Sequence, residues 1–409
     1  MKVAVVGGGL AGLSAALELV DAGHDVMLNE ARPTLGGAVQ TLPRRDGDPE
    51  PPPDNGQHVA LGCFTAYQRF LGRIGEAGAL RRMRLELPVI DERGRSSSIA
   101  HSPIAPFRYR HVPLGDRVRI LRLLATGGGP ARAGTFSDYL RAHGQSQGAI
   151  DRFWDVFMRP ALNLRSAEAS AEAGVVTVET ALRSGRRASE LLLPTKPLGE
   201  MHGDAAGRAL EAAGARVRTG TRVDDLDELD ADAIVIAVPP RESARLLGEP
   251  PPELDDSPII SVHLWFDRAL LPHLLAALLG SDAHWVFDRG ALTGHEPERG
   301  QYLTVVSSGA PELMELRGRE LVDRLAGAVT ERLGRAELLW SRVSREPAAA
   351  IAVRPGSERH RRGATTDRPN VVRAGAWTAT GWPATMEGAV RSGLTAARAL
   401  TAAREEVTA

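Results

Sequence analysis

The sequence predicts an α/β fold in which two domains are interleaved along the chain. Three observations support this prediction. The chain has 409 residues, 43% of them hydrophobic, which is enough for more than one buried core. Its first thirty residues alternate between short apolar runs and a helical apolar pattern. Similar apolar runs return at residues 215–223 and 232–240, so the first domain is expected to collect segments that are far apart in sequence.

A β-α-β unit is predicted at the N-terminus. Residues 3–6 form a short apolar run that is typical of a buried strand. Leu13, Ala16, Leu17 and Val20 then repeat with the period of a helix. A second strand pattern covers residues 25–28 and ends at an acidic residue. Two parallel strands joined by a helix are the unit from which dinucleotide-binding domains are built.

The turn between the first strand and the helix carries the motif G-x-G-x-x-G at Gly7, Gly9 and Gly12. These glycines allow a tight turn, a close approach of the backbone to a pyrophosphate, and close packing of the helix on the strand. Leu10 and Ala11 lie where the helix begins, and its free N–H groups point at the phosphates. The motif therefore predicts a Rossmann-like dinucleotide site.

Two features after the second strand bear on the kind of dinucleotide. Glu30 lies 18 residues beyond Gly12, where a carboxylate can accept hydrogen bonds from a ribose diol. Gly36 and Gly37 follow soon after and allow a second close approach to a cofactor. The glycine-rich residues 126–134 follow a helical pattern and contain a proline, so we predict a flexible loop there and no second dinucleotide motif.

The remaining patterns predict how the chain is divided. A discontinuous dinucleotide-binding domain is expected from residues 1–75, 199–246 and 346–409. A substrate domain is expected from residues 76–198, which are mainly helical in pattern, and from residues 247–345, which suggest an antiparallel sheet followed by a helix.

Composition excludes several classes of function. The formal charge is −1, with 50 basic and 51 acidic residues, so nucleic acid is not an expected partner. Cys63 is the only cysteine, which excludes an internal disulfide and a multi-thiolate metal centre and favours a cytoplasmic location. We predict no metal site. No run of 18 apolar residues is present, so no membrane-spanning helix is expected.

Five stretches in a fixed order resemble one family. They are DNGQH, FWDVFMRPALNLRSAEASA, ELLLPTKPLGE, ISVHLWFDR and GAWTATGWPATMEGAVRSG. Together they resemble the squalene-associated FAD-dependent desaturases, the hydroxysqualene dehydroxylases, within the flavin amine oxidase and phytoene desaturase superfamily. The resemblance implies FAD, an FAD-binding domain of the amine oxidase type interleaved with a mixed α+β substrate domain, and a long apolar isoprenoid substrate. The implied reaction reduces hydroxysqualene to squalene, with electrons from an external donor.

The resemblance also implies which residues surround the flavin. Asn55, Gly56, Gln57 and His58 are expected near the flavin ring or the mouth of a substrate tunnel. His58 is a candidate proton donor because imidazole titrates near neutral pH, and the alternative is a structural or cofactor-contacting role. Gln57 and Asn55 are the other candidate catalytic residues. The expected cofactor contacts are Gly7, Gly9, Leu10, Ala11, Gly12, Glu30, Ala31, Gly36, Gly37, Ala38, Gly56, Val223, Gly375, Ala376, Pro383, Thr385, Met386 and Ala389.

The C-terminal motif is predicted to approach the flavin closely. Gly375 and Ala376 are expected beside the ribityl chain, and residues 383–386 are expected to begin the last helix, with N–H groups aimed at flavin N1 and O2. Glu387 is expected to be held by Arg391 or by the fold. Two positions depart from the family pattern: Ala38 stands where an arginine is usual, and Ala376 stands where an aspartate is usual.

Other functions fit the same scaffold. One is a polyene desaturase or an amine oxidase, for which Trp377 and Trp382 are the available aromatic pair. Another is a non-catalytic homologue that acts as a scaffold or lipid carrier. The apolar residues 270–280 are expected to form a tunnel wall or core helix, or alternatively a patch that dips into a membrane. In that case the arginine-rich residues 106–124 would lie beside anionic head groups, which makes peripheral membrane contact a further expectation.

Overall fold

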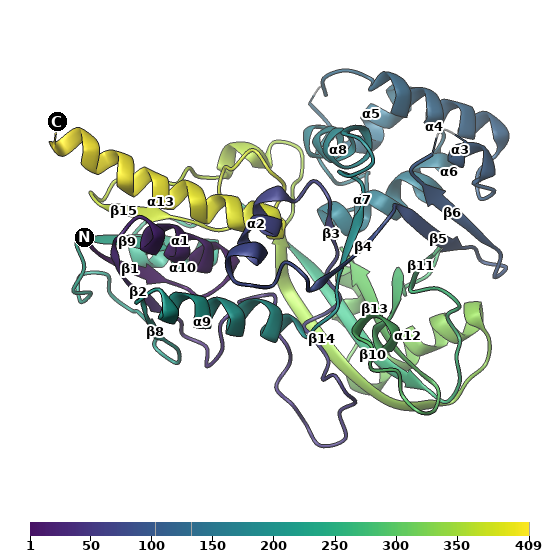
Figure 1. Cartoon of the computed structure of the whole chain (residues 1–409). Helices are drawn as coiled ribbons and strands as arrows, with labels where there is room; N and C mark the ends of the chain where they lie inside the picture. Colours follow the sequence, from purple (N-terminus) through teal and green to yellow (C-terminus); the bar gives the residue numbers. More distant parts are fainter. Residues whose placement is uncertain (103, 132, 409) are drawn as a thin grey trace.

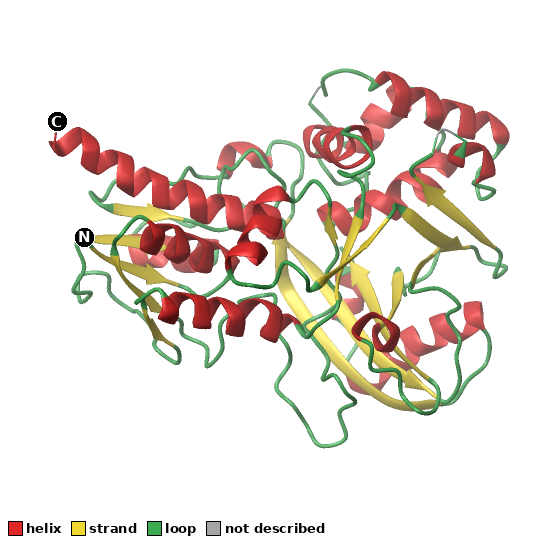
Figure 2. Ribbon diagram, in the orientation of Figure 1, coloured by secondary structure: helices red, strands yellow, loops and turns green. Residues whose placement is uncertain are grey.

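The computed structural model describes residues 1–102, 104–131 and 133–408. Figure 1 shows two lobes, one holding both termini and one built from the middle of the chain. Three sheets organise them, with five, seven and three strands. Figure 2 shows that helices cover the sheet of the first lobe and cluster at the far end of the second.

The first lobe is organised by a parallel sheet of five strands in the order β15-β9-β1-β2-β8. The strand patterns predicted near the N-terminus and at residues 215–223 and 232–240 are confirmed. Within residues 215–223, only three residues pair in the sheet. The strands are β1 (Lys2–Val6), β2 (Asp25–Asn29), β8 (Arg216–Arg218), β9 (Ala233–Ile236) and β15 (Val371–Arg373).

Two helices from opposite ends of the chain pack together on this sheet. They are α1 (Leu10–Asp21) and α13 (Met386–Thr408), and they form one of the most extensive helix contacts in the molecule. A β-carbon on Gly393 would lie 2.2 Å from the carbonyl oxygen of Ala11, so a glycine is required where the two helices meet. The other helices of this lobe are α2 (Thr65–Arg73), α9 (Ala205–Ala212), α10 (Pro240–Leu247), and the short η3 (Gly199–Asp204) and η5 (Ser357–His360).

The second lobe contains a sheet of seven strands in the order β14-β10-β13-β12-β11-β5-β6. All its pairs are antiparallel except β11 with β5. The helix α12 packs on the β10 and β14 side of it. The elements are β5 (Glu86–Ile90), β6 (Ser96–Ala100), β10 (Asp256–Phe266), β11 (Leu275–Leu278), β12 (Trp285–Asp288), β13 (Gln301–Ser308), β14 (Leu338–Ile351), α11 (Arg289–Thr293), α12 (Gly318–Leu333) and η4 (Pro311–Met314).

The helical part of this lobe is formed by residues 105–183. It packs around a cluster that contains Trp154, Phe136 and Phe153. Its elements are α3 (Ala105–Arg108), α4 (Leu114–Thr126), α5 (Phe136–Ala142), α6 (Gln147–Ala149), η1 (Ile150–Trp154), α7 (Asp155–Leu162), α8 (Ala171–Val178) and η2 (Glu179–Arg183). A small sheet joins the lobes and consists of β3 (Ala60–Leu61), β7 (Leu191–Pro194) and β4 (Leu80–Met83).

Three sequence predictions need correction or comment. Residues 270–280 do not form a helix, because Leu275–Leu278 pair with β12 and β5 as the buried strand β11. Leu275 lines the large apolar cavity, which agrees with the tunnel-wall alternative, and the burial of this strand removes it from contact with a membrane. The long strand β14 was not predicted. Its pattern is interrupted by Pro347, which an edge strand tolerates. The glycine-rich segment after α4 begins with Gly127 in the left-handed region, and its Arg132 lies outside the described residues.

The structure also bears on membrane insertion. Within the described ranges, no helix combines the length and the apolar character that a membrane span requires.

Candidate active site

One large cavity runs from the N-terminus of α1 to the face of the seven-stranded sheet. Leu10 and Gly36 line it at one end, and strands β10, β13 and β14 line it at the other. Its wall is mostly apolar, which is typical of a site for a small hydrophobic molecule. The large apolar side chains on this wall include Leu87, Phe157, Leu191, Leu275, Trp285 and Phe287.

The glycine turn at the α1 end leaves no room for side chains. A β-carbon on Gly7 would lie 2.4 Å from the carbonyl oxygen of Ala237, and one on Gly12 would lie 1.9 Å from the carbonyl oxygen of Gly7. Gly9 differs, since the nearest atom to its β-carbon position is 3.8 Å away on Gly37. Gly7 and Gly12 are therefore required by packing, whereas Gly9 keeps the backbone open for a phosphate at the helix N-terminus. The turn fits the pyrophosphate of a dinucleotide.

Glu30 is fixed at the end of β2. One carboxylate oxygen accepts a hydrogen bond from the N–H of Gly8 at 2.6 Å, and the other accepts one from the N–H of Arg32 at 2.7 Å. Each carboxylate oxygen can accept a second bond, so the group can still bind a ribose diol. The carboxylate is thus oriented before any ligand arrives.

The Gly36-Gly37 pair lies directly against the glycine turn. Gly36 bridges to Gly9, and a β-carbon on Gly37 would lie 2.9 Å from the α-carbon of Gly9. Both residues have positive φ, at 108° and 61°. The pair therefore brings a second backbone segment against the turn, and Gly36 also reaches the cavity wall.

The DNGQH loop is anchored by a buried aspartate. The carboxylate of Asp54 accepts hydrogen bonds from Arg289 at 2.7 Å, from the hydroxyl of Thr41 at 2.7 Å and from the N–H of Leu198 at 2.9 Å. Its carbonyl oxygen contacts His263 Nε2 at 2.9 Å. Asp54 and Arg289 are each 2% exposed, so this ion pair is shielded from solvent. The loop is held from both lobes.

Asn55 and Gly56 shape the loop where it meets the cavity. The amide of Asn55 donates to the carbonyl of Ala38 at 3.2 Å and accepts from the hydroxyl of Ser344. Gly56 has φ of 82°, and a β-carbon there would lie 2.5 Å from the hydroxyl oxygen of Ser261. Asn55 lines the cavity, but both ends of its amide bond to protein, which favours a positioning role.

Gln57 and His58 both line the cavity. Burial lowers the pKa of His58, an effect that the negative charge of Asp54 opposes. The Nδ1 atom of His58 is buried and has no hydrogen-bond partner within the described residues. A buried, largely neutral imidazole with an open nitrogen can exchange a proton with a bound substrate.

The C-terminal motif is clamped by an arginine that the sequence analysis did not single out. Arg361 is 5% exposed, and its Nη2 donates to the carbonyls of Ala376 at 3.0 Å, Thr378 at 2.6 Å and Trp382 at 2.9 Å. Its Nε donates to the carbonyl of Trp377 at 3.3 Å. Its Nη1 also pairs with Glu358 at 3.0 Å. No motif marks Arg361 as a clamp, because the carbonyls that it holds lie 15 to 21 residues away in the sequence.

The two tryptophans of this motif differ in orientation. Trp377 is buried behind the segment, and its indole N–H donates to the carbonyl of Val238 at 3.1 Å. A β-carbon on Gly375 would lie 2.4 Å from this indole nitrogen, which explains the glycine. Trp382 lines the cavity and packs edge-to-face on Phe64 at 6.3 Å between ring centroids. The two tryptophans therefore do not form a pair facing the cavity.

Glu387 has the structural role that was predicted. It is fully buried, and it pairs with Arg391 at 2.7 Å. The same carboxylate accepts hydrogen bonds from the N–H groups of Ala66 and Tyr67, at 3.1 and 2.8 Å, in the first turn of α2. Glu387 thus ties the start of α13 to the N-terminus of α2.

Glu346 is a second polar residue that the sequence did not reveal. It lies on β14 opposite Ile259, and both residues line the cavity. Within the described part of the chain it is the only acidic residue on this wall, and its carboxylate has no hydrogen bond or ion pair. The signal was hidden because β14 was not recognised as a strand.

The expected site residues fall into two groups. Those on the cavity wall are Leu10, Gly36, Ala38, Asn55, Gly56, Gln57, His58, Ala376, Pro383, Thr385, Met386 and Ala389. Those behind the wall or along the glycine turn are Gly7, Gly9, Ala11, Gly12, Glu30, Ala31, Gly37, Val223 and Gly375. Val223 belongs to an apolar cluster with Ala4 and Val6, so its side chain packs in the core of the first lobe.

Comparisons with known proteins agree with this geometry. A hydroxysqualene dehydroxylase from Sinorhizobium fredii is 28% identical over 424 residues, which cover 97% of this chain and 97% of the relative. A 15-cis-phytoene desaturase from Solanum lycopersicum is 25% identical over 98% of this chain and 77% of the relative. The crystal structure of an oxidoreductase from Methanosarcina mazei has a TM-score of 0.75 at 19% identity, over 96% of this chain and 99% of that one.

The family assignment explains the cradle at the α1 end of the cavity. The family model for flavin containing amine oxidoreductases matches residues 10–401. The glycine turn, the oriented carboxylate of Glu30 and the clamped C-terminal motif are the residues that would hold FAD, the cofactor of this chain. The chain therefore belongs to the flavin containing amine oxidoreductase family, and it is an oxidoreductase.

Proposed function

We propose that this oxidoreductase removes the hydroxyl group from a long apolar allylic alcohol of the hydroxysqualene type. The observation that carries the proposal is the cavity wall, which is apolar over most of its length and offers few polar side chains near the DNGQH loop. A hydrocarbon chain needs apolar contact along its length and a polar site only at the carbon that reacts. The similarity to a hydroxysqualene dehydroxylase over nearly the full length supports the same substrate class.

The proposed reaction needs a proton, a hydride and an environment without water. Reduced FAD supplies the hydride when it is bound. The C–O bond breaks as the hydroxyl group takes a proton and leaves as water, and the allylic carbon gains the hydride, so the products are the hydrocarbon, water and oxidised cofactor. His58 is the proposed proton donor, because this residue lines the cavity and its Nδ1 has no hydrogen-bond partner within the described residues.

Glu346 is proposed to stabilise positive charge on the substrate. Departure of water leaves an allylic cation, and a carboxylate on a residue that lines an apolar cavity favours such a charge. Since Glu346 has no partner within the described residues, its charge is available to the substrate. Ser344, which stands two residues earlier on the same face of β14, is already bonded to Asn55.

The test is a single-turnover reaction without oxygen. Enzyme whose FAD has been photoreduced is mixed with hydroxysqualene, and flavin reoxidation is followed with squalene formation. One squalene for each flavin reoxidised is the expected result. Unchanged reduced flavin with intact hydroxysqualene would overturn the proposed substrate.

A polyene desaturase is the second candidate, and the similarity to a phytoene desaturase favours it. That reaction runs in the opposite redox direction, since the substrate would reduce oxidised FAD. Mixing the oxidised enzyme with a polyene such as phytoene and following loss of the flavin absorption band separates the two candidates. The orientation of Trp377 away from the cavity argues against an amine oxidase with an aromatic pair.

A further inference from the structure

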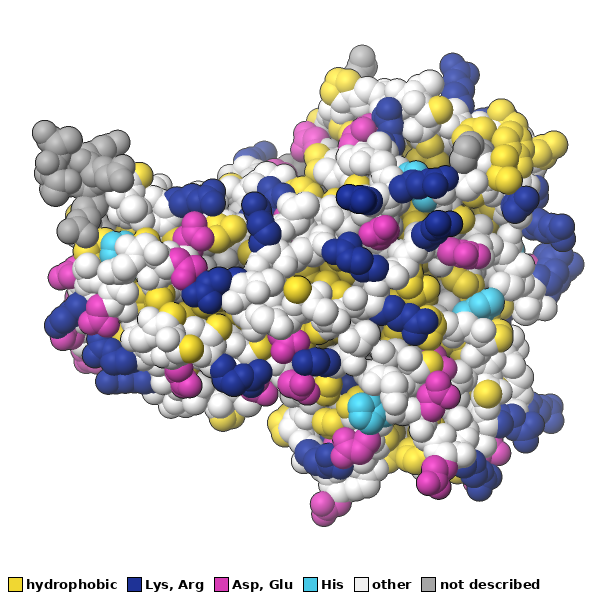
Figure 3. Space-filling view, viewed as in Figure 1, with side chains coloured by type: hydrophobic (Ala, Val, Ile, Leu, Met, Phe, Trp, Pro, Cys, Tyr) yellow, Lys and Arg dark blue, Asp and Glu magenta, His cyan; other side chains and the backbone are white. Residues whose placement is uncertain are grey.

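An exposed apolar patch lies at the far end of the second lobe. Within the described residues, six large hydrophobic side chains are exposed, and four of them fall between residues 104 and 118. Figure 3 shows hydrophobic side chains gathered at the upper right, over α3 and the beginning of α4, with lysine or arginine side chains beside them. The patch consists of Ile104, Phe107, Leu114 and Val118.

The side chains of the patch point outward because the opposite face of α4 is used for packing. Asp116, Ile120 and Leu123 are the buried residues of this helix. Leu114 and Val118 are four residues apart, so they lie one above the other on the exposed face. Leu114 is 62% exposed, which is a large exposure for a leucine in a folded helix. This apolar surface is unpartnered in the chain itself.

The segment that carries the patch is also rich in basic side chains without ion-pair partners. Between residues 101 and 126 the only acidic residue is Asp116, which is buried and bonded to Arg119 and Ser146. By contrast, the guanidinium groups of Arg108, Arg110 and Arg122 have no ion pair with any described residue. The chain as a whole carries a formal charge of −1, so this surface is a local excess of positive charge.

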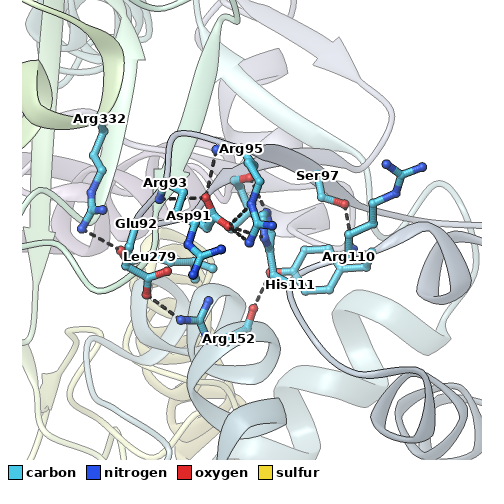
Figure 4. A network of polar contacts seen from close by, with 12 residues as sticks. Asp91, Glu92, Arg93, Arg95, Ser97, Arg110, His111, Arg152, Leu279 and Arg332 are labelled. Atoms are coloured by element: carbon cyan, nitrogen blue, oxygen red, sulfur yellow. Dashed lines mark hydrogen bonds and ion pairs between the residues drawn. The ribbon is translucent and has the colours of Figure 1, made fainter.

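A network of polar contacts, shown in Figure 4, holds the segment that carries the patch. Ser97 on β6 accepts a hydrogen bond from the N–H of Arg110 at 3.0 Å, and His111 contacts the carbonyl of Val89 on β5 at 2.8 Å. Asp91 lies 3.7 Å from His111 and is bonded to Arg95. These contacts fix the segment between α3 and α4 on the β5–β6 hairpin, so the patch is held in place as a surface.

The same patch lies one layer away from the candidate active site. Ile120 and Leu123, on the inner face of α4, share a hydrophobic cluster with Leu87 and Leu275. Leu87 and Leu275 also line the cavity. The helix α4 further contacts η2, which contributes Thr180 and Ala181 to the wall.

We propose that Ile104, Phe107, Leu114 and Val118, with the unpaired arginines around them, dock this enzyme on the surface of an anionic lipid bilayer. An apolar patch enters the boundary between head groups and acyl chains, while arginines beside it bind anionic head groups. The combination fits a lipid surface better than a protein partner, because three unpaired guanidinium groups surround an apolar centre. Docking here places the helical end of the second lobe against the membrane and leaves the FAD lobe in solution (Figure 1).

The test uses the full-length enzyme with bound FAD and sedimentation with vesicles. Vesicles of phosphatidylcholine with phosphatidylglycerol are compared with phosphatidylcholine alone, at low and high salt. Binding is expected to the anionic vesicles and to weaken with salt. The double variant Arg108→Gln/Arg110→Gln is expected to lower the partition coefficient about thirtyfold. The variant Phe107→Ser/Leu114→Ser is expected to lower it by about tenfold or more.

A matched control comes from the two exposed hydrophobic residues outside the patch. The variant Val176→Ser/Leu339→Ser removes the same kind of side chain elsewhere and is expected to bind vesicles like the wild type. The proposal is overturned if the wild-type enzyme stays in the supernatant with anionic vesicles, or if patch and control variants bind equally. It is also overturned if the Phe107→Ser/Leu114→Ser variant dissociates an oligomer in light scattering without changing vesicle binding. The readout does not depend on the proposed reaction.

Discussion

The two ends of the cavity are built on opposite principles. At the FAD end, buried charged groups such as Glu30, Arg361 and Glu387 direct their hydrogen bonds to backbone atoms and to neighbouring charged side chains. At the substrate end the wall is mostly apolar, and some of the polar side chains on it keep an atom without a protein partner. Nδ1 of His58 and Oδ1 of Asn163 are buried without partners within the described residues, and the Glu346 carboxylate is unpaired.

The contrast between the two ends reflects their tasks, which are to retain a cofactor at one end and to react with a substrate at the other. A cofactor that stays bound is held by a backbone cradle whose geometry is fixed in advance, and the buried charges exist to fix it. A substrate that enters and leaves needs polar atoms that the protein has left unsatisfied. Substitutions at the FAD end should therefore change stability and cofactor retention, whereas substitutions at the substrate end should change turnover.

The largest effect is expected at Arg361. In the variant Arg361→Met, four carbonyl groups of residues 376–382 lose their donor. A buried polar group left without a partner costs about 1 to 3 kcal/mol, so the free energy of unfolding should fall by about 3 kcal/mol or more. The purified variant should also lose FAD, which its visible absorption spectrum would reveal.

The exposed neighbour Arg359 provides the control for this change. The variant Arg359→Met removes an exposed guanidinium group two residues away that donates to His360 and has no ion pair with any described residue. It should keep the stability and the FAD content of the wild type. If Arg361→Met also kept both, the clamp would have no role in holding the cofactor end.

The second effect tests the substrate end. The variant His58→Gln should lower kcat/KM about a hundredfold with FAD content unchanged, because a positioned proton donor contributes that much or more. Burial lowers the pKa of His58, so its protonated form becomes abundant only at a pH below the ordinary range of histidine. The rate of the wild type should therefore rise toward acidic pH, while that of the variant should lose this dependence.

His295 offers a control for the same substitution, because it is exposed and lies outside the cavity wall. The variant His295→Gln should keep the rate and the pH profile of the wild type. A wild-type pH profile in His58→Gln would show that the proton comes from another group.

A third effect concerns the buried histidine at the junction of the two ends. Burial, together with the positive charge of Arg289, lowers the pKa of His263 to about 3 from 6.5. Between these values the unfolded chain binds a proton that the folded chain does not, so stability falls as the pH falls. From pH 7 to about 5 this histidine should remove about 2 kcal/mol from the free energy of unfolding.

Urea unfolding of the wild type and of His263→Gln at the two pH values measures this contribution. The variant should start less stable, because the contacts to Asp54 and Thr304 are weakened, but should lose about 2 kcal/mol less on acidification. Equal losses in the two proteins would mean that His263 is not held neutral in the folded state. His202, whose burial lowers its pKa to about 4, should add a similar dependence in both.

The FAD end was largely predictable from sequence because its constraints are local. Gly7, Gly9 and Gly12 follow a fixed spacing, and the Glu387 and Arg391 pair is four residues apart on one helix.

The substrate end was less predictable because its residues meet only through the fold. Arg289 and Asp54 are separated by 235 residues, and Asn55 and Ser344 by 289. Glu346 faces the cavity only because β14 pairs along β10, and Pro347 breaks the alternation that would have identified the strand. The membrane-dipping alternative was assigned to residues 270–280, although the exposed apolar side chains lie at 104–118.

The smallest effect is expected at Glu346, and it tests directly whether polar groups at the substrate end serve the reaction. The variant Glu346→Gln keeps the shape and polarity of the side chain and removes its charge, so FAD content and stability should not change. Loss of a carboxylate that stabilises a transient cation should lower kcat about tenfold and leave KM nearly constant, since the neutral substrate does not carry that charge. The exposed Glu331 on α12 gives the matched control, and Glu331→Gln should match the wild type. If instead KM rose while kcat stayed constant, Glu346 would bind the hydroxyl group of the substrate before the reaction. The polar groups at both ends of the cavity would then contribute to binding.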